Sequence, residues 1–110
     1  MTGFAITRDG GQALVTLGAK LTATEVPELQ PALKAEIVAG VREIVFDLSE
    51  TVSLDSTGIG LLIAANNSLA PIQGAIRLIN LTPDLVKLLQ SMRLVDRLHA
   101  TAAGQEVSRG

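Results

Sequence analysis

A strand and a helix follow one another in residues 42–60, which read REIVFDLSETVSLDSTGIG. Residues 42–48 have a β-branched, fully apolar centre, which is typical of a strand that is covered on both faces. Residues 55–58 are polar, as the first turn of a helix often is, and an aliphatic segment continues from them to Leu69. This stretch therefore predicts a central strand that leads into a helix.

A hairpin and a helix are predicted before the central strand. Residues 4–7 and 13–17 are short β-prone runs on either side of Asp9-Gly10-Gly11, a turn sequence in which glycine tolerates a positive φ. In residues 22–39 the apolar side chains recur every three or four residues, and Gly40 follows where a helix would end. The N-terminal part is thus expected to be an antiparallel hairpin followed by a helix.

The segments after the central helix continue this alternation. Residues 75–79 predict a short strand. Thr82-Pro83-Asp84 combines a cap, a proline for the first helical position and an acid for the helix dipole, so a third helix should begin there. Residues 95–99 predict a last short strand. The inner stripe of the third helix should consist of Leu85, Leu88, Leu89 and Met92.

These elements together indicate the fold class. Strands that alternate with helices at these lengths imply βαβ crossovers, and so a mostly parallel sheet with an antiparallel start and helices packed against it. A chain of 110 residues is long enough for one domain with its own core. We expect residues 1–100 to form this domain and residues 101–110, which are small and polar, to be a flexible C-terminal tail.

The composition excludes several classes of function. Cysteine is absent, which rules out thiol catalysis and thiolate metal sites, and His99 is the single histidine. The formal charge of -2 comes without a basic cluster, and Phe4 and Phe46 are the aromatic residues. Nucleic-acid binders usually need a positive surface and often stacking rings. We therefore expect no metal, no cofactor and no nucleic-acid partner.

Signals for membranes and secretion are not found. The longest apolar stretch, residues 59–65, is far below the roughly 20 residues that cross a bilayer. The first residues lack the basic start, apolar middle and cleavage site of a secretory signal. We expect a cytoplasmic protein without direct membrane insertion.

Three chemical interpretations compete for residues 55–60. A nucleotide-binding loop would explain the two glycines, but neither a third glycine nor a Gly-Lys-Ser/Thr ending completes it. A serine-hydrolase elbow would have glycine where this chain has Leu54, and His99 would be the one possible base. In the third interpretation, Asp55 or Ser56 simply caps the helix, which contributes about 1 kcal/mol.

A helical wheel divides the central helix into two sides. The side that must face the core carries Gly58, Leu61, Leu62, Ala65 and Leu69. The opposite side carries Ser56, Ile59, Gly60, Ile63 and Asn67. Two isoleucines beside a serine favour a docking surface for a partner, since apolar groups on an exposed face mark contact sites. The alternative is that the third helix or a loop covers them.

Residues 55–60, preceded by the strand that ends Phe46-Asp47-Leu48-Ser49, resemble the signature of STAS domains, and specifically of the bacterial anti-sigma factor antagonists. The resemblance covers about Phe4 to His99. It implies an α/β fold of the STAS type, with a mixed, mostly parallel sheet of four or five strands, packed helices and an N-terminal β-hairpin. Further similar residues fall in 18–21, 26–29, 77–80 and 89–97.

The resemblance also implies a function. In the family the serine after the aspartate, here Ser56, is phosphorylated by a partner that is both serine kinase and anti-sigma factor, and a serine phosphatase is the second expected partner. Unphosphorylated antagonist binds the anti-sigma factor and frees the sigma factor, and phosphorylation ends this. Ile59 corresponds to a partner contact. Thr22 stands where related antagonists often carry an acid. This departure predicts that phosphorylation is slower, is carried out by a different partner, or is absent.

We interpret the chain as a regulator rather than an enzyme, a monomer or weak homodimer with Ser56 as phospho-acceptor. Asp55, Thr57 and Gly58 surround that site, with Thr57 a secondary acceptor at most. Two alternatives stay open. One is a STAS scaffold subunit of a transport or signalling complex, without phosphate exchange; the other is a small enzyme or nucleotide-binding domain, which has few candidate groups here. The predicted partner contacts are Ile59, Gly60, Ile63 and Asn67.

Overall fold

The predicted N-terminal hairpin is present in the computed structural model, which describes residues 3–103. Strands β1 (Phe4–Asp9) and β2 (Gln12–Leu17) pair antiparallel in continuous register, from Phe4 opposite Leu17 to Asp9 opposite Gln12. Gly10 has a φ of 64°, a conformation that glycine adopts without steric cost. The turn sequence therefore sets both the position and the register of the hairpin.

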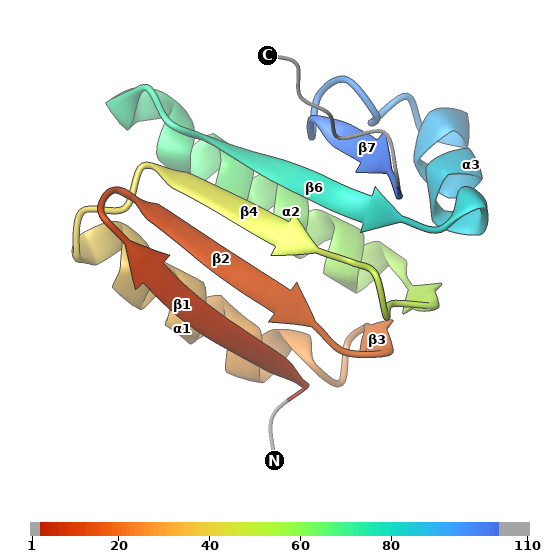
Figure 1. The fold of residues 1–110 in the computed structure, drawn as a ribbon, viewed down its shortest axis with the longest axis horizontal. Helices are drawn as coiled ribbons and strands as arrows, with labels where there is room; N and C mark the ends of the chain where they lie inside the picture. Colours follow the sequence, from red (N-terminus) through yellow and green to blue (C-terminus); the bar gives the residue numbers. More distant parts are fainter. Residues whose placement is uncertain (1–2, 104–110) are drawn as a thin grey trace.

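The main sheet has five strands in the order β1-β2-β4-β6-β7 (Figure 1). Strand β4 (Glu43–Asp47) lies between β2 and β6 (Ala75–Leu81) and is parallel to both, and β7 (Ala100–Ala102) is parallel to β6. The mixed, mostly parallel sheet and the central place of β4 are confirmed.

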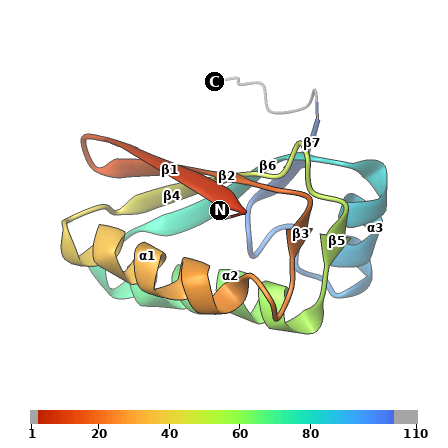
Figure 2. The ribbon, with the colours of Figure 1, turned by 90° about the horizontal axis from the view of Figure 1, so that it is seen from below.

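Helices α1 (Val26–Val38) and α2 (Ser56–Leu69) pack on one face of this sheet, and α3 (Pro83–Ser91) packs near its β6–β7 side (Figure 2). The short 3-10 helix η1 (Ala70–Ile72) ends α2. The helix-facing side chains of Val15, Phe46 and Leu78, which are neighbours across three strands, are completely buried. This row is the centre of the core.

The two faces of β4 are both buried, but they are covered by different elements. No helix among the described residues lies on the second face of the sheet (Figure 2). On that face Leu14 is 39% exposed, yet its neighbour Val45 is only 5% exposed. Leu14 and Arg77 flank Val45 in the register of β2, β4 and β6, so the adjacent strands shield it. The apolar centre of β4 is therefore buried on both faces as expected, although no described helix lies on the second face.

Three further expectations need correction at the level of single elements. The last strand is β7, residues 100–102, instead of residues 95–99, which form turns with Leu98 buried. Two residues of the expected tail thus belong to the sheet, and residues 104–110 lie outside the described residues. Met92 is 43% exposed because it follows the last residue of α3 and leaves its inner stripe. Helix α1 begins at Val26, since residues 22–25 form a turn before it.

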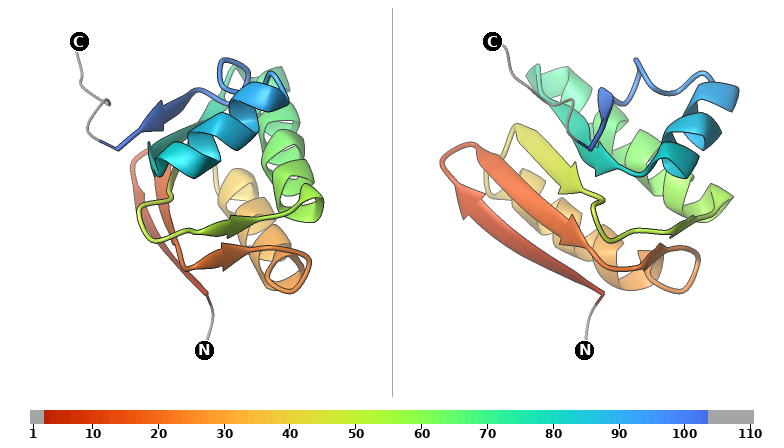
Figure 3. Two further views of the ribbon diagram at one scale, coloured as in Figure 1. Left: turned by 90° about the vertical axis from the view of Figure 1, so that its right-hand side faces the viewer. Right: turned by 45° about the vertical axis from the view of Figure 1, so that its right-hand side comes forward.

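A second, two-stranded sheet was not expected. Strands β3 (Lys20–Leu21) and β5 (Ser53–Leu54) pair parallel and carry the chain from the main sheet to the first turns of α1 and α2 (Figure 3). Val52 N and Ser53 N both donate to the carbonyl oxygen of Ala19, at 2.8 and 3.1 Å. This small sheet brings the start of α2 beside residues 20–25.

Candidate functional site

The first turn of α2 is capped by Asp55. Its backbone is extended, with φ −103° and ψ −178°, and its Oδ1 accepts a hydrogen bond from Gly58 N at 2.8 Å. A carboxylate here satisfies a backbone donor that has no partner within the helix, and its charge is favoured by the helix dipole. The capping role that the sequence allowed for Asp55 or Ser56 therefore belongs to Asp55.

The second oxygen of the same carboxylate reaches another segment. Asp55 Oδ2 accepts from Ala23 N at 3.0 Å, and Asp55 N donates to the carbonyl oxygen of Leu21 at 3.4 Å. Asp55 thus links the start of α2 to the turn before α1. Nothing in the sequence pattern indicated this link, because the two residues are 32 positions apart.

Gly58 is required by how closely α2 approaches β3. A Cβ atom at this position would lie 2.2 Å from the carbonyl oxygen of Leu21, which real Cβ atoms do not do. That oxygen belongs to the backbone of a paired strand, so it cannot move aside easily. The sequence analysis placed Gly58 near Ser56, the predicted phosphorylation site, and the geometry supplies a structural reason for glycine there. Gly60, in contrast, has open space around it.

Hydrogen bonding keeps the Asp55 side chain ionised. The backbone N–H of Gly58, followed by that of Ala23, lowers the pKa of the Asp55 carboxyl below its ordinary value, and partial desolvation opposes this less strongly. Each of these donors stabilises the charged form. The residue beside Ser56 is therefore a carboxylate at neutral pH.

Glu25 is a structural residue that the sequence reasoning missed. Its Oε1 accepts from Thr22 N at 2.8 Å and from the Thr22 hydroxyl at 2.7 Å. These bonds, the side-chain bond first, lower the pKa of the Glu25 carboxyl. Thr22-Ala23-Thr24-Glu25 has the T-x-x-E pattern of a capping box, which was the available signal. The chain therefore has a carboxylate against Thr22, although Thr22 itself is not an acid.

Ser56 and Thr57 are both exposed at the start of α2. Ser56 is the first residue of the helix, and Asp55 is the cap that precedes it. The serine hydroxyl is thus accessible from solvent at a helix N-terminus, where a negatively charged group is stabilised.

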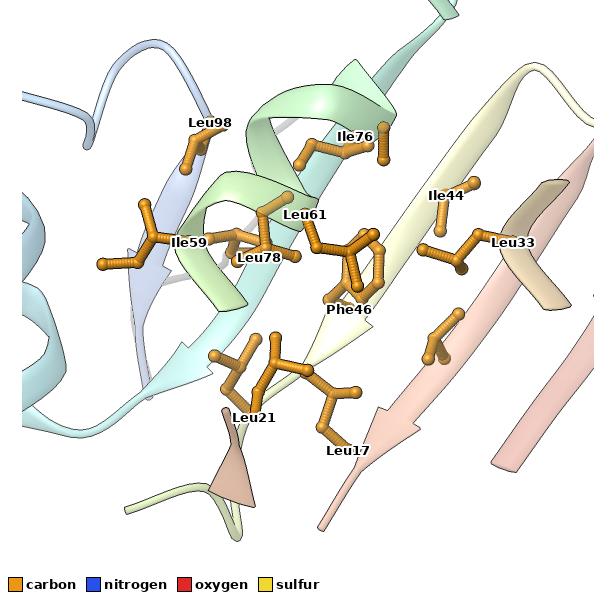
Figure 4. Packing of buried hydrophobic residues seen from close by; sticks show 14 of the residues in the cluster. Leu17, Leu21, Leu33, Ile44, Phe46, Ile59, Leu61, Ile76, Leu78 and Leu98 are labelled. Carbon is orange, nitrogen blue, oxygen red and sulfur yellow. The ribbon is translucent and has the colours of Figure 1, made fainter. Parts of the chain in front are cut away.

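The expectation that Ile59 lies on an outer face is wrong. Ile59 is 4% exposed and belongs to the same core cluster as Leu85 and Leu89 of α3. In Figure 4 it points from α2 toward the side where α3 and β7 lie. Ile59 is therefore buried in the core on the side of α3 and β7, in line with the alternative that the sequence left open, in which the third helix or a loop covers it. The buried stripe predicted for the core is confirmed, and consists of Gly58, Leu61, Leu62, Ala65 and Leu69.

The other predicted contact residues are divided. Gly60 and Asn67 are exposed, whereas Ile63 is half-buried and packs against the core. The exposed side of α2 next to Ser56 is consequently less apolar than the wheel suggested. Of the two isoleucines expected there, only the half-buried Ile63 offers apolar surface to a partner.

Two concave sites have linings that do not include Ser56. A groove of about 60 Å³ runs between α1 and α2, with Leu33, Ile37 and Leu61 among its lining residues. A shallow depression beside Arg42 and Gly74 lies at the start of β4 and β6. Within residues 3–103, no three His, Cys, Asp or Glu side chains gather as they would around a metal ion. In the same range no helix is long and apolar enough to cross a membrane.

Comparison with known families gives one match. The family model of the STAS domain matches residues 4–105. Among curated proteins, none matches this sequence.

Solved structures with a similar fold include the anti-sigma factor antagonist SpoIIAA in its unphosphorylated form. It is 21% identical, with 94% of this chain and 90% of that chain covered, and the TM-score is 0.80. The Bacillus cell fate determinant SpoIIAA in its phosphorylated form has 21% identity, coverage of 94% and 93%, and a TM-score of 0.74. The murine anion transporter Slc26a9 contains a similar region, with 16% identity, 87% of this chain and 17% of that chain covered, and a TM-score of 0.69. At these identities the likeness is one of fold.

Proposed function

This chain belongs to the STAS domain family, and we propose that it is a cytoplasmic anti-sigma factor antagonist whose switch is the phosphorylation of Ser56. The observation that carries the proposal is the place of Ser56: an exposed serine at the first position of α2, directly after the capping Asp55. The fold shared with SpoIIAA, which is known in an unphosphorylated and a phosphorylated form, supports a switch by phosphorylation.

The unphosphorylated chain binds the anti-sigma factor in this proposal, and the sigma factor is released. The same partner is the serine kinase: it transfers the γ-phosphoryl group of ATP to Ser56 Oγ, so that an O–P bond forms, the bond to ADP breaks and the hydroxyl proton leaves. A serine phosphatase restores the hydroxyl by hydrolysis. The chain itself is the substrate and regulator and does no catalysis.

Phosphorylation at this position should leave the fold intact. A phosphoserine carries about −1.5 to −2 charge at neutral pH, and a helix N-terminus tolerates negative charge. Ser56 is exposed, so the phosphate remains hydrated. The effect on binding is then electrostatic: a hydrated dianion stands in the surface that the partner must cover.

The docking surface differs from the one expected from the wheel. Because Ile59 is buried, it supports the surface from below and does not contact the partner in this proposal. The exposed groups around Ser56 are Thr57 and Gly60 on α2 and, across the Asp55–Ala23 hydrogen bond, Ala23 and Thr24. Ile63 and Asn67 extend the surface along α2.

The phosphorylation test compares two neighbouring hydroxyls. Purified wild type, Ser56→Ala and Thr57→Ala are incubated with ATP and the candidate kinase, and modified peptides are located by mass spectrometry. We expect phosphate on wild type and Thr57→Ala, but not on Ser56→Ala. Phosphate that persists in Ser56→Ala and is lost in Thr57→Ala would contradict the assignment.

A second candidate is a scaffold function without phosphate exchange. It is favoured by the STAS-like fold within the murine anion transporter and by Thr22, which stands where related antagonists often carry an acid. A chain that forms a stable complex with a partner, but is never modified at Ser56 in the presence of that partner and ATP, would select this function.

A further inference from the structure

Asp55 holds two separate segments with one carboxylate. Its Oδ1 accepts from Gly58 N within α2, at 2.8 Å, and its Oδ2 accepts from Ala23 N in the turn before α1, at 3.0 Å. The second bond crosses between elements that are far apart in the sequence. The position of the turn relative to α2 therefore depends on the charge state and orientation of this side chain.

Apart from its bond to Asp55, the turn formed by residues 22–25 is bonded within itself and to the first turn of α1, where Val26 N donates to the carbonyl oxygen of Thr22 at 3.1 Å. Thr22 N and the Thr22 hydroxyl donate to Glu25, and Glu25 N donates to the carbonyl oxygen of Thr22 at 2.9 Å. Thr24 N lies 3.4 Å from the Thr22 hydroxyl oxygen. Ala23 N is different, because it donates out of the turn to Asp55. When this bond breaks, the turn can therefore move away from the start of α2 while it keeps its own bonds and its bonds to α1.

A phosphate on Ser56 would act on the two bonds of Asp55 unequally. Ser56 and Asp55 are adjacent, so a phosphate dianion and the carboxylate would lie close together and repel each other. The bond to Gly58 is supported by the helix dipole and by the cap geometry. The bond to Ala23 joins Asp55 to an exposed turn and lacks that support. Repulsion is relieved with least loss by giving up the bond to Ala23.

We propose that phosphorylation of Ser56 and the Asp55–Ala23 hydrogen bond exclude each other, so that phosphorylation releases the turn of residues 22–25 from α2 while the helix stays capped. Asp55 is then a positioning residue that transmits the state of Ser56 to a second segment of the docking surface. The biological role of this coupling rests on the proposed function, since Ser56 must be the residue that is phosphorylated. The partner would then meet the phosphate, and it would also lose part of the surface of this chain that it binds.

The test uses the full chain with phosphoserine introduced at position 56 during translation, so that no kinase is needed. Amide hydrogen exchange is measured by NMR for Ala23 and Gly58. We expect Ala23 to exchange about tenfold faster in the phosphorylated chain, which corresponds to the loss of a charged hydrogen bond of about 1.4 kcal/mol. Gly58 should change little. Equal or slower exchange at Ala23 would overturn the proposal, because the phosphate would then leave the bond intact or accept it.

The variant Asp55→Asn separates coupling from capping. Asparagine caps helices as well as aspartate does. When its oxygen accepts from Gly58 N, its NH2 group faces Ala23 N, so two donors meet and the hydrogen bond is lost. We expect Ala23 to exchange rapidly in Asp55→Asn already, and phosphorylation to add nothing further. A phosphorylation effect of the same size in both backgrounds would overturn the role of Asp55. Asp55→Ser, which also caps, serves if Asp55→Asn does not fold.

Asp84→Asn is the matched control. It removes one negative charge from the exposed first turn of another helix, α3, and should leave the response of Ala23 unchanged. A failure of the proposed function is visible separately, as the absence of kinase-dependent phosphate on Ser56. It would leave the exchange measurements on the phosphoserine chain valid.

Discussion

Ser56 in the first turn of α2 and Ile59 at the start of the second lie on the same side of the helical wheel, but their environments are opposite. Ser56 is exposed, whereas Ile59, three residues later, is 4% exposed and packs with the core cluster that includes leucines of α3. The side chain of Ser56 is not covered by later elements of the described chain. The start of α2 is held in place by the hydrogen bonds of Asp55 to Ala23 and to Leu21 of β3. The comparison teaches that a wheel identifies residues that share a side, but not which part of that side a later element covers.

The largest effect on stability is expected for the two buried aliphatic residues of α2. Ile59→Ala and Leu62→Ala should each lower the free energy of unfolding by about 2 to 5 kcal/mol, because each removes buried methyl groups and leaves a cavity. Urea denaturation of both variants measures this. An Ile59 on the outer face would lose well under about 1 kcal/mol. A loss that small for Ile59→Ala would show that Ile59 is not buried in solution.

A matched glycine pair sharpens the same comparison. Gly58→Ala should destabilise the protein by about 1 to 3 kcal/mol, the usual range for overpacking, because the new Cβ meets the carbonyl oxygen of Leu21. Gly60→Ala, two positions later and in open space, should stabilise it by about 0.5 to 1 kcal/mol, because alanine favours the helix. Thermal unfolding distinguishes the two. If both variants changed stability in the same direction, the close approach of α2 to β3 would be wrong.

Acid should lower the stability of the fold by protonating hydrogen-bonded carboxylates, one of which caps the first turn of α2. The pKa values of Asp55 and Glu25 are lowered by hydrogen bonds; for Asp47, burial raises the pKa, but bonds from Ser49 and Asn80 outweigh it. Folded-state pKa values below the ordinary 3.8 and 4.5 mean that these groups stabilise the fold above that range, and that this contribution is lost as pH falls through the folded values.

Urea unfolding at a series of pH values below about 5 should therefore show a falling free energy of unfolding, with a shallower fall in Asp55→Asn. Asp84→Asn, which changes an exposed acid of α3, is the control for the change in charge. An equally steep fall in wild type and Asp55→Asn would contradict the role assigned to the Asp55 carboxylate.

The smallest effect on stability is expected at Ser56 itself. Ser56→Ala and Ser56→Asp should change the free energy of unfolding by no more than about 0.5 kcal/mol, because the side chain is exposed. Their effects should differ in binding. Calorimetric titration should find Ser56→Ala bound to the anti-sigma factor like wild type and Ser56→Asp bound at least about tenfold more weakly, since a charge in the interface opposes association. A folded Ser56→Ala that fails to bind would show that the hydroxyl is itself a contact.

Much of the fold was predictable because its signals are local. The Gly10 turn, the Thr82 cap, which accepts from Leu85 N at 3.3 Å, and the leucine stripe of α2 are each encoded within a few neighbouring residues. The candidate site was predictable in part: Ser56 and Asp55 were found at the start of α2, whereas the small sheet of β3 and β5 was not. Strands of two residues carry too little periodicity to be recognised.

The sequence by itself determined that α2 begins near Asp55 and Ser56 and that the stripe of Gly58, Leu61, Leu62, Ala65 and Leu69 faces the core. These properties arise from backbone donors and side chains within one or two helical turns of each other. Only the tertiary structure decided that Ile59 is buried and that Asp55 also binds Ala23. Both depend on segments far away in the chain, the part that follows β6 in one case and the turn before α1 in the other. Their positions follow from the packing of the whole core and not from any local pattern.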